Sequence, residues 1–147
     1  MADIADFEAL VPLDRGLAVI AVTGPDGNIR PSVTNVGVID HPVDGSRVVG
    51  VVARGQARKL DHIRARPRAS AVLRAGWQWA AVEGPAELAG PDDPMAGLDA
   101  ERLRLLLREI FTAAGGTHDD LDAYDRAMAD ERRTAILITP ERVFTNG

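Results

Sequence analysis

The chain has 147 residues, of which 46% are hydrophobic and 27% charged, and its formal net charge at pH 7 is −5. This length and composition predict one globular domain over residues 1–147. The absence of cysteine excludes disulfides, thiolate metal sites and cysteine nucleophiles. The acidic charge, the lack of a long apolar run and the lack of a signal-like N-terminus lead us to expect a cytoplasmic protein without nucleic-acid or membrane partners.

The N-terminal part of the chain predicts one short helix and three strands. The helix covers Ile4–Leu10 and ends near Pro12. The turn segments at residues 25–28 and 44–46 are short enough to join antiparallel neighbours. The strands are expected at Leu17–Thr23, Arg30–Asp40 and Arg47–Ala53.

The middle of the chain predicts a helix and two more strands. Gln56–Arg66 has apolar residues at helical spacing and is followed by Pro67, which marks its end. The strands are expected at Ala69–Ala75 and Trp77–Leu88. Gly84 and Pro85, inside the second of them, indicate an edge or a bulge.

The C-terminal part predicts two helices and a last strand. Apolar residues recur at the spacing of an amphipathic helix at Leu103, Leu107, Ile110, Phe111 and Ala114. Gly115 ends that helix, and Thr117 or Asp119 caps a second one that runs to about Ala129. The last strand is expected at Thr134–Ile138, extended after Pro140 by Val143 and Phe144.

Six short strands joined largely by hairpin-length turns predict an antiparallel sheet, and a sheet of this size protects its edges most easily by closing into a barrel. The expected fold class is therefore α+β, mainly β, with helices flanking a six-stranded barrel. Known catalytic motifs are missing. The three histidines match no metal-binding spacing, and no serine lies in a GxSxG context. We predict no metal site and no catalytic side chain.

The basic residues are unevenly placed. Of 17 basic residues 16 are arginine, and Lys59 is the one lysine. The segment from Arg54 to Arg74 holds seven basic residues and one acid, a net charge of +6. Arg54, Arg58 and Lys59 lie where a strand gives way to a helix, so charged donors and free helix N–H groups meet there. This arrangement suits a phosphate group, and an arginine-rich solvated helix face is the alternative interpretation.

Asn35 and two tryptophans are further candidates for binding. An asparagine is disfavoured in a β-branched strand, and the Asn35 amide offers both a donor and an acceptor to a heterocycle. An asparagine at a strand edge or bulge is the alternative. Trp77 and Trp79 lie on one face of their strand, where they could stack on a flat ligand, fill an interface or join the core.

Several segments together resemble the pyridoxamine 5′-phosphate oxidase-like split β-barrel superfamily, and within it the actinobacterial branch that binds the deazaflavin coenzyme F420. The resemblance covers residues 5–144. Its segments are Arg30–Val36, Arg58–Leu60, Arg66–Ser70, Trp77–Leu88 and Tyr124–Phe144.

The resemblance implies a homodimer of split barrels with two cofactor sites at the subunit interface. It assigns the cofactor phosphate to Arg58 and Lys59, with Arg54 as an addition. It places the segment from Arg30 to Asn35 along the ring system. Hydroxyl or backbone bonds are then expected from Ser32 and Thr34, and the second subunit contributes Trp77 and Trp79. Ala53 is a departure, because many relatives have a hydroxyl residue there.

The function that the resemblance implies is hydride transfer between F420 and a small organic acceptor, with the cofactor performing the redox step. One alternative is an FMN-dependent oxidoreductase on the same fold. The other is a protein that binds a cofactor or a tetrapyrrole without turnover.

Overall fold

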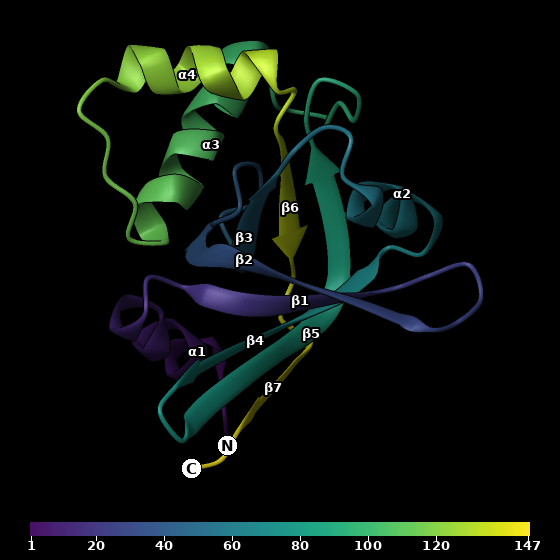
Figure 1. Cartoon of the computed structure of the whole chain (residues 1–147), viewed down its shortest axis with the longest axis vertical. Helices are drawn as coiled ribbons and strands as arrows, with labels where there is room; N and C mark the ends of the chain where they lie inside the picture. The colour runs from purple at the N-terminus through teal and green to yellow at the C-terminus, as the bar shows by residue number, and fades with distance from the viewer.

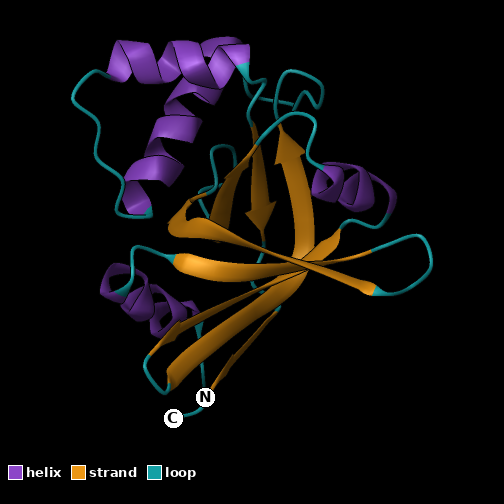
Figure 2. Cartoon of the chain, in the orientation of Figure 1, coloured by secondary structure: helices purple, strands orange, loops and turns teal.

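The computed structural model describes residues 1–147 and is built around a closed antiparallel β-barrel (Figures 1 and 2). The strands pair in the order β4-β1-β2-β3-β6-β5, and β5 pairs back with β4. The predicted six-stranded antiparallel barrel with flanking helices is confirmed. The strands are β1 (Leu17–Thr23), β2 (Ile29–Asp40), β3 (Arg47–Ala53), β4 (Arg68–Ala75), β5 (Gln78–Ala89) and β6 (Thr134–Ile138), and β7 (Arg142–Thr145) is added outside the closed ring.

Four α-helices surround the barrel, and three of them begin at an aspartate whose carboxylate accepts a backbone N–H. The helices are α1 (Ile4–Leu10), α2 (Arg58–Ala65), α3 (Ala100–Ala113) and α4 (Leu121–Asp130). The cap of α4 is Asp120, so the predicted caps Thr117 and Asp119 are wrong. None of the helices has the length and apolarity that crossing a membrane requires.

The barrel interior is filled by inward-facing strand residues and closed by α1 and α2. Phe7 of α1 and Leu60 of α2 are fully buried, and Ile63 of α2 is 1% exposed. They pack in one cluster with residues such as Ile20 and Val82 from β1 and β5. Removing this much apolar surface from water is the main force that holds the barrel and fixes α2 against it.

A second core lies outside the barrel, where α3 covers β2, β3 and β6. Leu106 and Ile110 of α3 are buried against Val48 and Leu137. Gly50 allows this close approach, because a Cβ there would lie 2.8 Å from Ile110 Cγ1. One half of the outer sheet surface is therefore covered by a helix.

The predicted edge or bulge at Gly84 is the point where β5 changes partner. Residues up to Pro85 pair with β4, some of them also with β7, and the residues from Ala86 onward pair with β6. A Cβ at Gly84 would lie 1.9 Å from the carbonyl oxygen of Thr139, so only glycine lets the chain after β6 cross here. This crossing turns Val143 and Phe144 into a separate strand, and the prediction that they extend the last strand is wrong.

Candidate functional site

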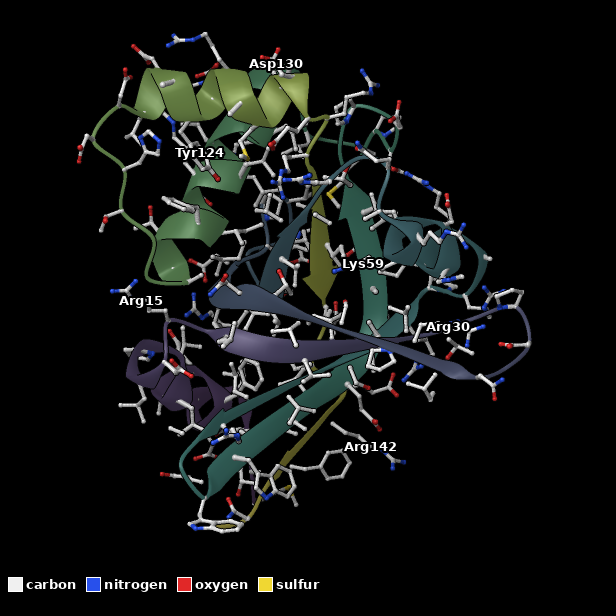
Figure 3. The ribbon with its side chains drawn as sticks, viewed as in Figure 1. Arg15, Arg30, Lys59, Tyr124, Asp130 and Arg142 are labelled. Atoms are coloured by element: carbon white, nitrogen blue, oxygen red, sulfur yellow. The ribbon has the colours of Figure 1, made fainter.

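The ends of β3 and α4 meet at a polar cavity, here called the cation pocket. It measures about 310 Å³. It is lined by Thr34, Val52, Ala53, Arg54, Gln56, Ala57, Lys59 and Arg133. Figure 3 shows Lys59 reaching from α2 toward the middle of the barrel. Three cationic side chains are thereby brought to one cavity, from the loop after β3, from α2 and from the loop between α4 and β6.

The backbone at Gly55 holds the two loops of the cation pocket together. Its N–H donates to the carbonyl of Glu131 at 3.1 Å, and a Cβ would lie 2.7 Å from the carbonyl oxygen of Arg132. The φ of Gly55 is not positive, so backbone freedom is not the reason for glycine here. Close approach of the loop after α4 is the reason.

The cations of this junction are free of carboxylate partners. Nine of the 16 arginines form ion pairs with Asp or Glu. Arg54, Arg58 and Lys59 form none. Arg133 is the exception in the cation pocket, since its guanidinium lies 3.0 Å from Glu131. In a chain with a net charge of −5, uncompensated positive charge at one junction indicates a site for an anion.

Burial acts directly on Lys59. Desolvation lowers the pKa of its ammonium group, because the charged form loses water contacts without gaining a carboxylate. A bound anion would supply the missing compensation. The helix also favours a bound anion, because the first N–H groups of α2 are not capped by any side chain and remain free to donate.

The structure brings together some of the residues predicted for the phosphate and leaves others apart. Arg54, Lys59 and Thr34 line the cation pocket. Arg58 is exposed at the start of α2 and does not line it. Ser32 is half-buried on the same face of β2 as Thr34, just outside the lining.

Arg30 lies away from the cation pocket, at the hairpin end of β2 (Figure 3). Its guanidinium pairs with Asp26 of the β1–β2 turn at 2.9 Å. Thr34 is four positions further along the strand, about 13 Å away. Arg30 therefore holds the hairpin turn in this chain.

Asn35 uses its amide within the chain. Its Nδ2 donates to the carbonyl of Arg15 at 2.9 Å, and its Oδ1 accepts no hydrogen bond. It points to the opposite face of β2 from Thr34. The acceptor oxygen and the second N–H of the amide remain free for a ligand.

Trp77 and Trp79 lie at the β4–β5 hairpin, remote in the fold from this chain's own cation pocket. Trp77 is in the turn rather than in the strand and is 94% exposed. Asn146 fixes the hairpin, accepting from the Trp79 N–H at 2.9 Å and donating to the Trp77 carbonyl at 2.7 Å. Both indoles line an open cavity of about 970 Å³ with Leu17, Val19 and other residues of β1, β2 and β4.

This cavity is part of a larger surface, here called the apolar face. The face is the uncovered outer side of β2, β1, β4, β5 and β7, and it is formed by Leu17, Val19, Val33, Val72, Trp79 and Phe144. Cross-strand pairing puts Val33, Val19, Val72, Ala81 and Phe144 in one row. Contiguous exposed apolar surface of this kind marks an interaction site.

Arg133 is the site residue that sequence reasoning missed. It stands immediately before β6, and the pairing of Ala53 with Thr134 places it beside the end of β3. The available signal is a pair of arginines directly before a buried strand. The arginine pair indicates this site only when the β3–β6 pairing is known. That pairing joins residues about 80 positions apart, and no local pattern predicts it.

No protein-family model matches the chain. Solved structures do. A conserved hypothetical protein of Mycobacterium tuberculosis is 19% identical with a TM-score of 0.70, covering 99% of this chain and 84% of its own. A pyridoxamine 5′-phosphate oxidase-related, FMN-binding protein of Nostoc punctiforme is 14% identical with a TM-score of 0.67, covering 97% and 80%. An F420 reductase is 13% identical with a TM-score of 0.62, covering 94% and 95%.

The fold is therefore that of the pyridoxamine 5′-phosphate oxidase-like split barrels, as the resemblance in the sequence predicts. The likeness extends over nearly the whole chain. At this level of identity it establishes the fold, and function has to be argued from the site.

Proposed function

We propose that the chain is an oxidoreductase that binds a phosphorylated flavin-type cofactor, with the deazaflavin coenzyme F420 favoured over FMN. The observation that carries the proposal is the cation pocket, where Arg54, Lys59 and Arg133 converge. The preference for F420 rests on the sequence resemblance and is supported by the fold shared with an F420 reductase.

The donors of the cation pocket fit a phosphate group. The guanidinium groups of Arg54 and Arg133 and the Lys59 ammonium supply charged hydrogen bonds, and Thr34 adds a hydroxyl. Ala53 supplies no hydroxyl, so that contact is missing from this chain. Arg133 exchanges part of its interaction with Glu131 for the phosphate when the ligand binds.

The protein's own contribution is binding, orientation and exclusion of water. When bound, the cofactor supplies a hydride donor or acceptor. The segment of β2 that ends at Asn35 lies along the ring in this proposal, and the free Oδ1 of Asn35 accepts a hydrogen bond from a ring N–H. No side chain acts as a nucleophile.

A homodimer across the apolar face completes the site in this proposal. The face exposes valines on three neighbouring strands, with Val33 65% exposed and Val72 38% exposed. Two copies packed about a two-fold axis would bury the same row of each other. Trp77 and Trp79 of one copy would then reach the cofactor of the other.

Two titrations test the proposed function. We expect purified protein to bind F420 saturably, seen as a change in deazaflavin fluorescence, and to bind FMN more weakly. We then expect reduced F420 to be oxidised in the presence of an electron acceptor such as a quinone. Tight FMN binding without F420 binding would reverse the preference, and binding without turnover of any acceptor would leave the carrier function.

A matched pair of variants ties the result to the cation pocket. Lys59→Ala should weaken cofactor binding about tenfold to hundredfold, since a hydrogen bond to a charged group contributes about 1.5–3 kcal/mol. Arg126→Ala removes an exposed cation of α4 that does not line the pocket and should leave affinity unchanged. Equal affinity in Lys59→Ala and the wild type would show that the phosphate binds elsewhere.

A further inference from the structure

A second cavity, here called the Arg15 cavity, opens on the other face of β2. It measures about 410 Å³ and lies between the turn before β1, the middle of β2 and the end of α3. Asn35 lines it, whereas the neighbouring Thr34 lines the cation pocket. Nothing in the proposed phosphate site uses this cavity. The principal residues are Arg15, Asn35, Phe111, Gly115, Gly116 and Thr117.

The backbone of Arg15 is held in a conformation that an arginine rarely adopts, with φ of 53°. Gly16 follows with φ of 66° and packs so closely on β2 that a Cβ would lie 2.0 Å from the Val36 carbonyl oxygen. Val36 N–H donates to the Gly16 carbonyl at 2.8 Å, and Asn35 holds the Arg15 carbonyl. Because these contacts dictate the turn, the fold fixes the backbone from which the exposed Arg15 side chain extends to line the cavity.

The guanidinium of Arg15 has no partner within the chain, neither a carboxylate nor a hydrogen-bond acceptor. Figure 3 shows it at the gap between the turn before β1 and the end of α3, on the far side of the barrel from Arg30. Facing it is the half-buried ring of Phe111, held by stacking on Tyr124 at a centroid distance of 4.7 Å. Glycines at 115 and 116 leave the rim free of side chains.

We propose that the Arg15 cavity binds a small planar carboxylate. Arg15 donates a pair of hydrogen bonds to the carboxylate, and the flat part of the ligand lies against Phe111. The cavity volume suits one ring with its substituents. Since Asn35 also borders the proposed position of the cofactor ring, the ligand is the acceptor substrate. That last assignment rests on the proposed function, and the binding site itself does not.

Benzoate is the probe for this site, with the neutral benzamide as its matched control. In a ¹H–¹⁵N NMR titration of the protein without cofactor, benzoate should shift the amide signals of Arg15, Gly115, Gly116 and Thr117 saturably. Arg15→Asn removes the guanidinium and keeps a residue that tolerates positive φ. It should weaken benzoate binding about tenfold to hundredfold. Benzamide should bind the wild type as weakly as benzoate binds the variant.

A cation beside a helix C-terminus also stabilises that helix end, and the same variant separates the two roles. If Arg15 only stabilises the C-terminus of α3, Arg15→Asn lowers the thermal midpoint and leaves benzoate binding unchanged. That result would overturn the proposal. Shifts scattered over the surface overturn it as well. Arg15→Asn should retain the cofactor affinity of the wild type. If the wild type binds benzoate saturably but binds neither F420 nor FMN, the proposed function is contradicted and the proposed carboxylate site still stands.

Discussion

Gly55 sets the geometry of the cation pocket, because the loop that carries Arg54 packs directly on the backbone of Arg132. A methyl group at Gly55 would lie 2.7 Å from the Arg132 carbonyl oxygen and 2.8 Å from its Cβ. Arg132 itself has φ of 50°, so the loop after α4 has little freedom to move away. The position of Arg133 therefore depends on a residue without a side chain.

Gly55→Ala should destabilise the fold by about 1–3 kcal/mol, the usual cost of forcing an extra group into a packed contact. It should also weaken cofactor binding, because Arg54 and Arg133 move apart. Chemical denaturation and fluorescence titration measure the two effects. Gly24→Ala is the control, since its new methyl group meets only the flexible end of Arg30. Equal stability of the two variants would contradict this account of Gly55.

At the residue scale the sequence predicts part of the site. Lys59 stands out as the one lysine, and Arg54 follows a strand, so both could be found from composition and position. Asn35 could be recognised as unusual in a strand, but its partner, the Arg15 carbonyl, could not. Arg58 was predicted to bind phosphate because it lies at the junction between strand and helix and because the resemblance assigns the phosphate to Arg58 and Lys59. Successive residues of a helix lie on different sides of it, and the exposed Arg58 does not line the pocket, whereas Lys59 does.

At the element scale, the pair formed by α3 and α4 depends on Asp125. Its carboxylate accepts hydrogen bonds from Arg108 and Arg104, and only 14% of its side chain is exposed. The hydrogen bond from Arg108 lowers the pKa of Asp125 most, and the bond from Arg104 lowers it further, so the net shift is downward although burial raises the pKa. One carboxylate of α4 thus binds two arginines of α3, in addition to the stacking of Phe111 on Tyr124 between the same helices.

Asp125→Asn should lower the thermal midpoint at pH 7 by a few degrees. The difference from wild type should shrink as the pH is lowered. A carboxyl with a lowered folded-state pKa adds stability that is fully present above its unfolded pKa of about 3.9 and is lost as the pH falls through the folded value. Thermal scans from pH 7 down to pH 2 check this. Asp130→Asn, at the unpaired end of α4, should have no such effect. A difference that is as large at pH 2 as at pH 7 would exclude the ion pairs as its cause.

The elements themselves were largely predictable from the sequence. The periodicity of β-branched and apolar residues locates the six barrel strands and all four α-helices to within a few residues. The cap of α4 was misplaced, because Thr117, Asp119 and Asp120 are all good caps and only the path of the chain selects among them. The separate strand β7 was missed, because it exists through the crossing at Gly84.

At the scale of the whole molecule, the barrel has one outer half covered by α3 and one half left bare. Leucine, valine and aromatic side chains on the bare half are between 37% and 65% exposed. Burial of such a surface is worth about 25 cal/mol per Å², so covering the face is favoured over leaving it in water. In the proposed dimer each copy covers this face of the other.

Val19→Glu combined with Val72→Glu should give a folded monomer. The two valines are cross-strand neighbours at the centre of the row, and burying two carboxylates there costs more than the interface gains. Light scattering after gel filtration gives the mass, and circular dichroism confirms the fold. The variant should also lose cofactor affinity, because each site lacks the partner's tryptophans. Val43→Glu, in the exposed β2–β3 turn, is the matched control.

The central claim is that the cation pocket holds the phosphate of the cofactor. A crystal structure of the protein with bound F420, or with FMN if that binds more tightly, tests it most directly. The account predicts the phosphate within hydrogen-bonding distance of Lys59, Arg54 and Arg133, next to the first N–H groups of α2. A phosphate bound at another surface, with Lys59 still unpaired, would contradict it.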